Sequence, residues 1–313
     1  MWLRIKQRVS GSSLVRSKKA LVAIVLLAVI GLAFAQFVVR PHVRRWRAQI
    51  QEVPLAGASV AYRDIGHGSP SVVIINGMSC TMGGYHELQD ALAGTTRVLD
   101  YDRPGLGESS ANSEPRTLEV IDKDLKNLLE LLKVPPPYVM IGHSLGGHII
   151  RYYAHKHPGE VTAFVFLDAP HEDWFRYIRS TWAKDEVEEY FKWWSLPSDE
   201  YQGAALEEKL TYEKNCDLIR GIGVPPNVHT LMFTGNNYGH FRKTSPGREE
   251  DRKKWAEMQA SVLTGVKDGK QIVDFGAGHM FHKDRPKLVA DELKKLIERL
   301  RTEKAARTEA DGR

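Results

Sequence analysis

The sequence predicts an α/β protein in which helices flank a mostly parallel central sheet. Short apolar runs alternate with segments of helical periodicity along most of the 313 residues, and this alternation is typical of βαβ units. Runs such as residues 71–75 and 161–167 are almost entirely apolar, as strands buried on both faces are. A single large domain accounts for the length, so a second domain is not required.

The pattern sets the order of the expected elements. Strands are expected at residues 49–54, 59–64, 71–75, 97–101, 138–141, 161–167, 228–233 and 271–275. Helices are expected near residues 85–92, 118–132, 146–157, 253–263 and 286–300. Asp284 is placed to cap the last helix. Residues 171–225 break the rhythm, because they are rich in aromatic and charged residues, and they predict an inserted helical cap.

The first fifty residues differ from the rest in charge. The chain holds 44 Lys and Arg and 39 Asp and Glu, and ten of the basic residues but none of the acidic ones lie in this segment. The net charge of +5 therefore belongs to the N-terminus, and the body is mildly acidic. No basic stripe suited to nucleic acid is present in the body, so no nucleic-acid partner is expected.

An apolar run at residues 20–39 predicts a membrane-related segment. Gln36 is its only polar side chain, and about twenty such residues span the hydrocarbon core as a helix. Residues 1–19 are expected to form a basic cytoplasmic region, and residues 20–39 a transmembrane anchor or signal segment. Residues 40–50 are expected to form a basic linker. The body is then membrane-anchored and extracytoplasmic, or secreted after cleavage near Ala35, where Ala33-Phe34-Ala35 fits a cleavage site.

Cofactor chemistry is not indicated. Cys80 and Cys216 are the two cysteines, and neither lies in a metal-ligand spacing. In an exported protein they can pair or remain free thiols, and the sequence leaves both alternatives open. No metal or other cofactor is expected.

Gly142-His143-Ser144-Leu145-Gly146 is a G-x-S-x-G pattern that predicts Ser144 as a nucleophile. An apolar strand precedes it and a helix follows, which is the context this motif requires. The alternative is a serine in an ordinary strand-to-helix turn. An ester carbonyl attacked by a serine becomes an oxyanion and needs donors held in place. The backbone N–H groups of Leu145 and Met78 are the expected donors, Met78 being in the loop after the third strand.

A serine needs a general base, and His279 is the candidate among twelve histidines. It follows the last strand through Gly276–Gly278, which places it at the carboxyl edge of the sheet. His282 is the second candidate. His143 and His148 flank the nucleophile and are interpreted as packing or surface residues.

The acid that orients this base is expected to be Asp168, at the end of the sixth strand. The stretch after the seventh strand, residues 233–238, holds no carboxylate. A capping aspartate before Pro170 is the alternative role for Asp168. Glu249, Glu250 and Asp251 are the alternative acids, although they are interpreted as a solvated helix start.

Five motifs together resemble the α/β-hydrolase superfamily, in its serine esterase-like branch, from about residue 54 to 300. They are VVIINGMSC, VLDYDRPGLGESS, PYVMIGHSLGG, FVFLDAPHEDWF and GAGHMFHKDRP. The resemblance implies an α/β-hydrolase domain over 51–303 with a cap at about 171–225, followed by a polar tail at 304–313. The chain departs from the pattern of this family at two positions. Asn76 stands where relatives often carry His, and the expected acid is Asp168 because no carboxylate follows the seventh strand. Ser144 sets the chain apart from dehalogenases and epoxide hydrolases, which use Asp there.

The function implied is hydrolysis of an acyl ester, of carboxylesterase or lipase type, through a Ser-His-Asp triad. The same triad also serves amide, thioester and carbon–carbon hydrolysis and acyl transfer. A membrane-tethered binding protein with an idle pocket is a further alternative. The expected partner is a small apolar acyl substrate, and the oligomeric state is not predicted. The cap aromatics either line a pocket or attach the cap to the core; they are Trp174, Phe175, Tyr177, Trp182, Tyr190, Phe191, Trp193 and Trp194.

Overall fold

The structure is a computed structural model. It describes residues 20–21, 23–30, 45–195, 201–235, 242–243, 247–266 and 268–311. The chain divides into two compact units, Met1–Ile50 and Gln51–Arg313. Residue 22 and residues 31–39 of the predicted anchor lie outside the described residues. Across the part that is described, no helix is both long and apolar enough to cross a membrane.

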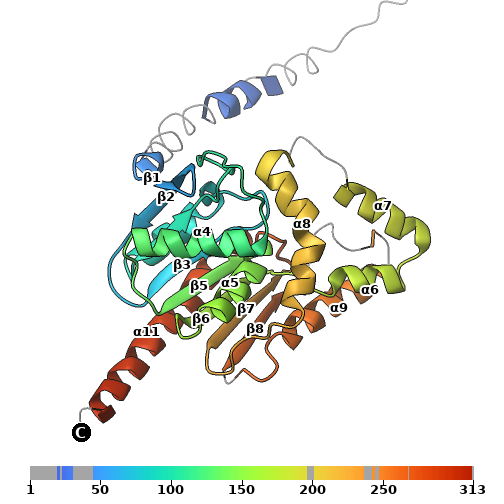
Figure 1. The fold of residues 1–313 in the computed structure, drawn as a ribbon. Helices are drawn as coiled ribbons and strands as arrows, with labels where there is room; N and C mark the ends of the chain where they lie inside the picture. Colours follow the sequence, from blue (N-terminus) through green and yellow to red (C-terminus); the bar gives the residue numbers. More distant parts are fainter. Residues whose placement is uncertain are drawn as a thin grey trace, which may run out of the picture. The chain divides into compact units, whose positions relative to one another are not determined.

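The second unit is built on an eight-stranded sheet with the strand order β1-β2-β4-β3-β5-β6-β7-β8 (Figure 1). β2 pairs antiparallel with both β1 and β4, and every other neighbouring pair is parallel. The strands are β1 (Gln51–Leu55), β2 (Ala58–Ile65), β3 (Ser71–Ile75), β4 (Val98–Tyr101), β5 (Tyr138–His143), β6 (Val161–Leu167), β7 (His229–Gly235) and β8 (Gly269–Asp274).

The continuous apolar runs become central strands because both faces of the sheet are covered. All five residues of β3 are buried. Val73 and Ile75 pack into the hydrophobic cluster on one face, whereas Val72 and Ile74 pack into the cluster on the other. Successive side chains of a strand point to opposite faces. A strand between two hydrophobic clusters is therefore buried on both faces, which favours apolar residues at nearly every position.

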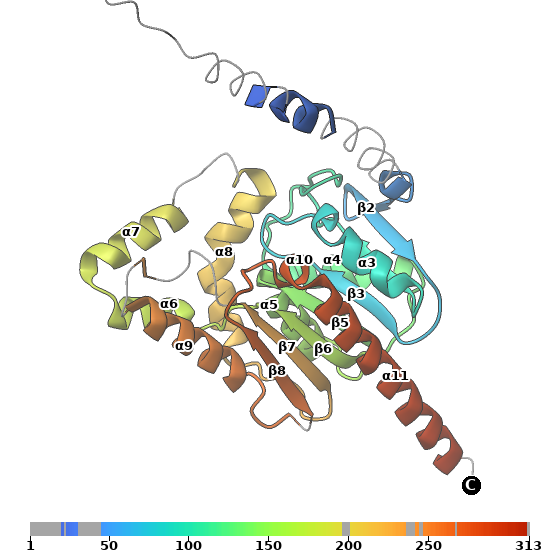
Figure 2. The same cartoon turned by 180° about the vertical axis from the view of Figure 1, so that it is seen from behind.

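Two layers of helices supply those cores (Figures 1 and 2). Leu125 of α4 and Ile149 of α5 belong to the first cluster. Leu92 of α3 and Val289 of α11 belong to the second. The apolar stripe predicted for α4 is buried along this face. The helices concerned are α3 (His86–Ala93), α4 (Leu118–Leu131), α5 (Leu145–Lys156), α9 (Gly247–Ser261) and α11 (Pro286–Asp311).

The last helix is longer than the sequence predicts. It continues past the expected end at residue 300 through the polar residues 304–311, because these are rich in Ala, Glu, Lys and Arg, which are good helix formers. Asp284 ends a short helix, α10 (Phe281–Asp284), and accepts the N–H of Gly278 at 2.6 Å. It therefore holds the loop that contains His279, where the sequence had suggested a cap for α11.

Three helices lie between β6 and β7, in the segment that the sequence singled out as aromatic. They are α6 (Trp174–Thr181), α7 (Lys184–Ser195) and α8 (Gly203–Ile219), and Figure 1 shows them together beside the sheet. We call them the insertion helices. Phe175 makes ring contacts with Phe191, Trp194 and Tyr212, at centroid distances of 5.0, 4.8 and 5.2 Å. Residues 196–200 and the side chain of Trp193 lie outside the described part.

Candidate active site

The five strands from β3 onward in the sheet order run parallel, so their carboxyl ends meet at one edge of the sheet. Ser144 follows β5, Asp168 follows β6, and His279 lies in the loop after β8. Ligands of open α/β sheets bind at this edge. The topology therefore brings three residues that are far apart in sequence to one place.

Ser144 lies in a strained turn between β5 and α5. Its φ of 51° and ψ of −122° are unusual for a residue with a side chain. Its N–H donates to the carbonyl of Leu167 at 3.1 Å, and its own carbonyl accepts from Gly147 at 2.9 Å. The next turn of backbone passes so close to β3 that a Cβ at Gly146 would lie 2.1 Å from the carbonyl oxygen of Ile75. Glycine is therefore required there.

The Asp168 carboxylate and the His279 imidazole form a hydrogen bond, in which Nδ1 of His279 donates to Oδ2 of Asp168 at 2.8 Å. Asp168 is completely buried. Its other oxygen, Oδ1, accepts from the Gly235 N–H at 3.0 Å, the Trp255 indole at 3.0 Å and the Gln259 amide at 3.2 Å. Four donors thus compensate the burial of one carboxylate, and the hydrogen bond to Oδ2 fixes the orientation of the His279 ring.

The alternative base and acids lie elsewhere. His282 donates to the carbonyl of Gly84 at 3.1 Å and stacks on Tyr85. Glu249 and Glu250 are exposed, as a solvated helix start predicts. The same interpretation is wrong for Asp251, which is fully buried because it faces inward from α9. Its carboxylate accepts hydrogen bonds from Tyr177, Trp182 and Arg242.

The loop after β3 approaches the turn at Ser144 closely. A Cβ on Gly77 would lie 2.7 Å from Nδ1 of His143 and 3.2 Å from Cβ of Ser144, so only glycine fits. Met78 follows directly and lines the same cavity as Ser144. Leu145 begins α5, where backbone N–H groups have no acceptor within the helix. Both N–H groups predicted as oxyanion donors are therefore on segments next to Ser144.

Asn76 is buried and is not among the described residues that line the cavity. Its amide donates to Oδ1 of Asp100 and to the carbonyl of Tyr101, both at 3.1 Å. The residue thus ties the end of β3 to β4. Burial raises the pKa of Asp100 well above its ordinary value.

His143 is buried, as the packing interpretation from the sequence expects, and it also makes two hydrogen bonds that the sequence did not predict. Its Nε2 donates to the backbone carbonyl of His279 at 2.9 Å, and its Nδ1 lies 2.6 Å from the phenolic oxygen of Tyr85. Because Nε2 faces an acceptor, it carries the proton, and Nδ1 of the neutral ring accepts from the Tyr85 hydroxyl. Burial, followed by the nearby His279 and His282, lowers the pKa of His143 well below its ordinary value, in keeping with a neutral ring.

A cavity of about 310 Å³ contains Ser144 and His279. Every insertion helix contributes aromatic rings to its wall, and the described lining residues include no Lys, Arg, Asp or Glu. The wall therefore carries no Lys, Arg, Asp or Glu charge among its described residues and is largely aromatic. Its aromatic members are Trp174, Phe175, Tyr190, Trp194, Tyr201, Tyr212 and Trp255.

The two cysteines are free thiols in the structure. Cys80 lines the cavity, whereas Cys216 is buried within α8. Burial raises the pKa of Cys80 above its ordinary value and that of Cys216 to about 12. The thiolate is the nucleophilic form of cysteine, so burial disfavours the reactive form of both residues.

Comparisons with known proteins agree with this architecture. Residues 70–192 match the family model described as alpha/beta hydrolase fold. The uncharacterized protein YqjL of Bacillus subtilis strain 168 is 35% identical over 194 residues, which cover 61% of this chain and 69% of that protein. The chain belongs to the α/β-hydrolase superfamily. It is also 26% identical over 242 residues to a 1-acylglycerol-3-phosphate O-acyltransferase of Arabidopsis thaliana, covering 68% of this chain but only 51% of the plant protein.

Solved structures show the same fold. A haloalkane dehalogenase loop variant, DbeA-M1 from Bradyrhizobium elkanii, superposes with a TM-score of 0.60 at 15% identity, covering 82% of this chain and 99% of that one. An esterase from Exiguobacterium antarcticum superposes with a TM-score of 0.57 at 15% identity, covering 79% of this chain and 99% of the esterase. At such identity the likeness concerns the fold, which supports many chemistries.

Proposed function

We propose that this chain hydrolyses carboxylic esters through an acyl-enzyme on Ser144. The observation that carries the proposal is the hydrogen bond between the buried Asp168 carboxylate and His279, on the same cavity as a strained Ser144. A nucleophile, a base and an orienting acid are the groups that acyl transfer requires.

Each group has a defined part in the proposed reaction. As Oγ of Ser144 attacks the ester carbonyl carbon, its proton moves to Nε2 of His279, and Asp168 stabilises the imidazolium that forms. The carbonyl oxygen becomes an oxyanion that accepts from the N–H groups of Met78 and Leu145. The intermediate collapses, and the leaving alcohol takes the proton from His279. Water then repeats these steps, releasing the acid and restoring Ser144.

The cavity favours a small, uncharged substrate. Its volume of about 310 Å³ lies at the small end of the range for small-molecule sites, about 300–1,000 Å³. An apolar aromatic wall stabilises an apolar acyl or alcohol group, but it offers no compensation to a buried charge. We therefore propose a neutral ester with a short or medium acyl chain.

Acyl transfer is the second candidate, because a plant relative is named 1-acylglycerol-3-phosphate O-acyltransferase. It would use the same acyl-enzyme with an alcohol in place of water. No cationic side chain to pair with a phosphate is found among the described residues of the cavity wall. A neutral alcohol is therefore the better acceptor, and product analysis with and without added glycerol distinguishes transfer from hydrolysis.

We further propose that residues 20–39 export the hydrolase unit, either as a retained anchor or as a signal segment cut near Ala35. The proposal rests on the apolar run and its basic flanks. Cell fractionation and the intact mass of the mature protein distinguish the two forms. A full-length chain in the soluble fraction would contradict both.

The test of the proposed reaction uses the full chain. We expect hydrolysis of p-nitrophenyl butyrate and covalent labelling of Ser144 by a fluorophosphonate, located by peptide mass. Ser144→Ala should lose both. Folded wild-type protein that gives neither turnover nor labelling would refute the proposal. Thermal stabilisation by an ester without turnover would then favour the idle-pocket alternative.

A further inference from the structure

A buried ion pair joins Glu208 of insertion helix α8 to Arg103, which lies in the segment after β4. Nε of Arg103 donates to Oε1 of Glu208 at 2.6 Å, and Nη2 donates to Oε2 at 2.8 Å. The exposed fractions of these side chains are 2% and 0%. A buried pair of this kind requires further hydrogen bonds to offset its desolvation. The remaining N–H groups of Arg103 provide such hydrogen bonds.

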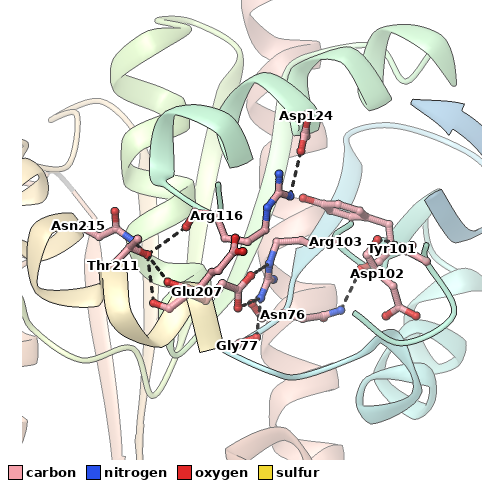
Figure 3. Close-up of polar contacts among 12 residues, drawn as sticks. Asn76, Gly77, Tyr101, Asp102, Arg103, Arg116, Asp124, Glu207, Thr211 and Asn215 are labelled. Carbon is pink, nitrogen blue, oxygen red and sulfur yellow. Dashed lines mark hydrogen bonds and ion pairs between the residues drawn. The ribbon is translucent and has the colours of Figure 1, made fainter. Parts of the chain in front are cut away.

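They are directed at the backbone of the loop after β3 (Figure 3). Nη1 of Arg103 donates to the carbonyl of Asn76, and Nη2 donates to the carbonyl of Gly77, both at 2.8 Å. One planar guanidinium thus holds a carboxylate of α8 and two successive backbone carbonyls. Lysine could not do this, because its single ammonium lacks the fork of five N–H groups that arginine presents.

Those two carbonyls determine the orientation of two peptide planes. In a planar trans peptide, the C=O and the following N–H point in opposite directions. The carbonyl of Asn76 shares its plane with the N–H of Gly77, which donates to the Tyr85 hydroxyl at 3.2 Å. The carbonyl of Gly77 shares its plane with the N–H of Met78. Since that carbonyl points at Arg103, the Met78 N–H points away from it.

We propose that Arg103 is a positioning residue for the oxyanion hole, held in place by Glu208 and acting through the peptide plane of Gly77 and Met78. The inference rests on the proposed function, because Met78 matters only if an oxyanion forms. It adds that α8 takes part in catalysis: the helix that supplies Tyr212 to the cavity wall also holds the arginine that aims an oxyanion donor.

The inference predicts which kinetic constant changes. An oxyanion donor acts on charge that develops in the transition state, so its misalignment lowers kcat and leaves KM nearly unchanged. Removing one such donor costs about 10²–10³ in kcat, and a misplaced one about 10². We expect a loss of about 10²-fold when Arg103 no longer holds the loop.

The test is the double variant Arg103→Met with Glu208→Met, which removes both charges and leaves no unpaired ion in the interior. Replacing a buried ion pair by apolar residues of similar size is often neutral for stability. Arg151 with Glu172 is the matched control, since it is also a buried bidentate pair and also donates to backbone carbonyls. Arg151→Met with Glu172→Met should keep kcat near wild type.

The measurements are kcat and KM for p-nitrophenyl butyrate, the inhibition constant of a trifluoromethyl ketone, and the melting temperature. In the Arg103 double variant we expect kcat to fall and the ketone, which forms an oxyanion on Ser144, to bind more weakly. KM should stay within about twofold of wild type. A folded double variant with wild-type kcat, or an equal loss in the control pair, would overturn the inference.

Two further comparisons keep the result decisive. If the double variant does not fold, Arg103→Lys replaces it, because the ammonium preserves the pair with Glu208 but cannot hold both carbonyls. A wild-type kcat in Arg103→Lys would also overturn the inference. If the wild-type chain itself shows neither turnover nor labelling of Ser144, the proposed function fails first, which is distinct from an active wild type with an equally active double variant.

Discussion

The phenolic oxygen of Tyr85 lies 2.6 Å from Nδ1 of His143, and it also accepts the Gly77 N–H at 3.2 Å. His143 in turn donates to the backbone carbonyl of His279. One tyrosine and one histidine therefore connect the loop of the proposed oxyanion donor to the loop of the proposed base. Their contacts define the relative position of two segments about 200 residues apart in sequence.

Tyr85→Phe should remove the hydrogen bonds that connect the loop after β3 to His143 and, through it, to the loop that contains His279. The change leaves two buried groups, the Gly77 N–H and Nδ1 of His143, without a partner. An unsatisfied buried polar group costs about 1–3 kcal/mol, so the loss of partners for these two groups should lower the free energy of unfolding by about 2–6 kcal/mol. We expect kcat to fall by about tenfold or more. Urea unfolding and steady-state kinetics check the two effects.

Tyr138→Phe is the matched control for that variant. Tyr138 is also buried, and its hydroxyl donates to the carbonyl of Val134 at 3.0 Å, at the start of β5. Loss of this one hydrogen bond should lower the free energy of unfolding by about 1–3 kcal/mol but leave kcat unchanged. Equal kcat values in the Tyr85 variant and wild type would show that the network has no kinetic role.

Asp168→Asn should abolish most activity without unfolding the chain. The amide oxygen of the new side chain can accept the three donors at Oδ1, which turns its NH₂ group toward Nδ1 of His279. That nitrogen must then accept, so Nε2 carries a proton and cannot act as a base toward Ser144. The corresponding change in a serine protease costs about 10⁴ in kcat, and a loss of that order is expected here.

Asp251→Asn provides the comparison, because Asp251 is equally buried and was an alternative acid. Its partners are Tyr177, Trp182 and Arg242 rather than His279. It should cost stability but retain kcat. Activity that survives in the Asp168 variant and disappears in the Asp251 variant would reverse the assignment.

Much of the architecture could be predicted because local pattern and tertiary environment agree. The apolar runs at residues 71–75 and 161–167 match β3 and β6 without a shift. The same agreement made the carboxyl edge of the sheet predictable, and with it the proximity of Asp168 and His279. Their roles in catalysis stay a proposal, since proximity does not establish turnover.

The remainder depended on contacts that have no sequence signal. His143 gives no local sign that both ring nitrogens are bonded, because its partners Tyr85 and His279 come from distant loops. Asp251 lies in a run of charged residues, and only the orientation of α9 makes it the buried one. Arg103 lies in a motif typical of the family, yet its pairing with Glu208 requires the packing of α8.

Stability should depend on pH through buried histidines, of which His148 is the clearest. Burial, followed by the nearby Arg151, lowers its pKa to about 4. Below its unfolded value of about 6.5, the unfolded chain therefore binds a proton that the folded chain does not. The contribution of His148 to stability should be constant above pH 6.5 and fall between pH 6.5 and 4, by roughly 3 kcal/mol.

His148→Gln removes that contribution while retaining an amide donor for the carbonyl of Pro170, which His148 contacts at 3.0 Å. The variant should be less stable than wild type at pH 8 and recover relative to it at pH 4. His155→Gln, an exposed position on the same helix, should follow wild type at each pH. Urea unfolding from pH 4 to 8 makes the comparison, and parallel curves for all three proteins would contradict the assignment.

Phe175→Leu should shift the preferred acyl chain toward greater length. Phe175 lines the cavity and contacts Phe191, Trp194 and Tyr212, so a smaller side chain opens the apolar wall. One methylene in such a pocket is worth about 1–3 kcal/mol. The ratio of kcat/KM for p-nitrophenyl hexanoate and butyrate should therefore rise by about tenfold or more. Phe164→Leu changes a buried ring of β6 outside this wall, and it should reduce stability without altering the ratio. A ratio that moves equally in both variants would mean that the insertion helices do not select the acyl group.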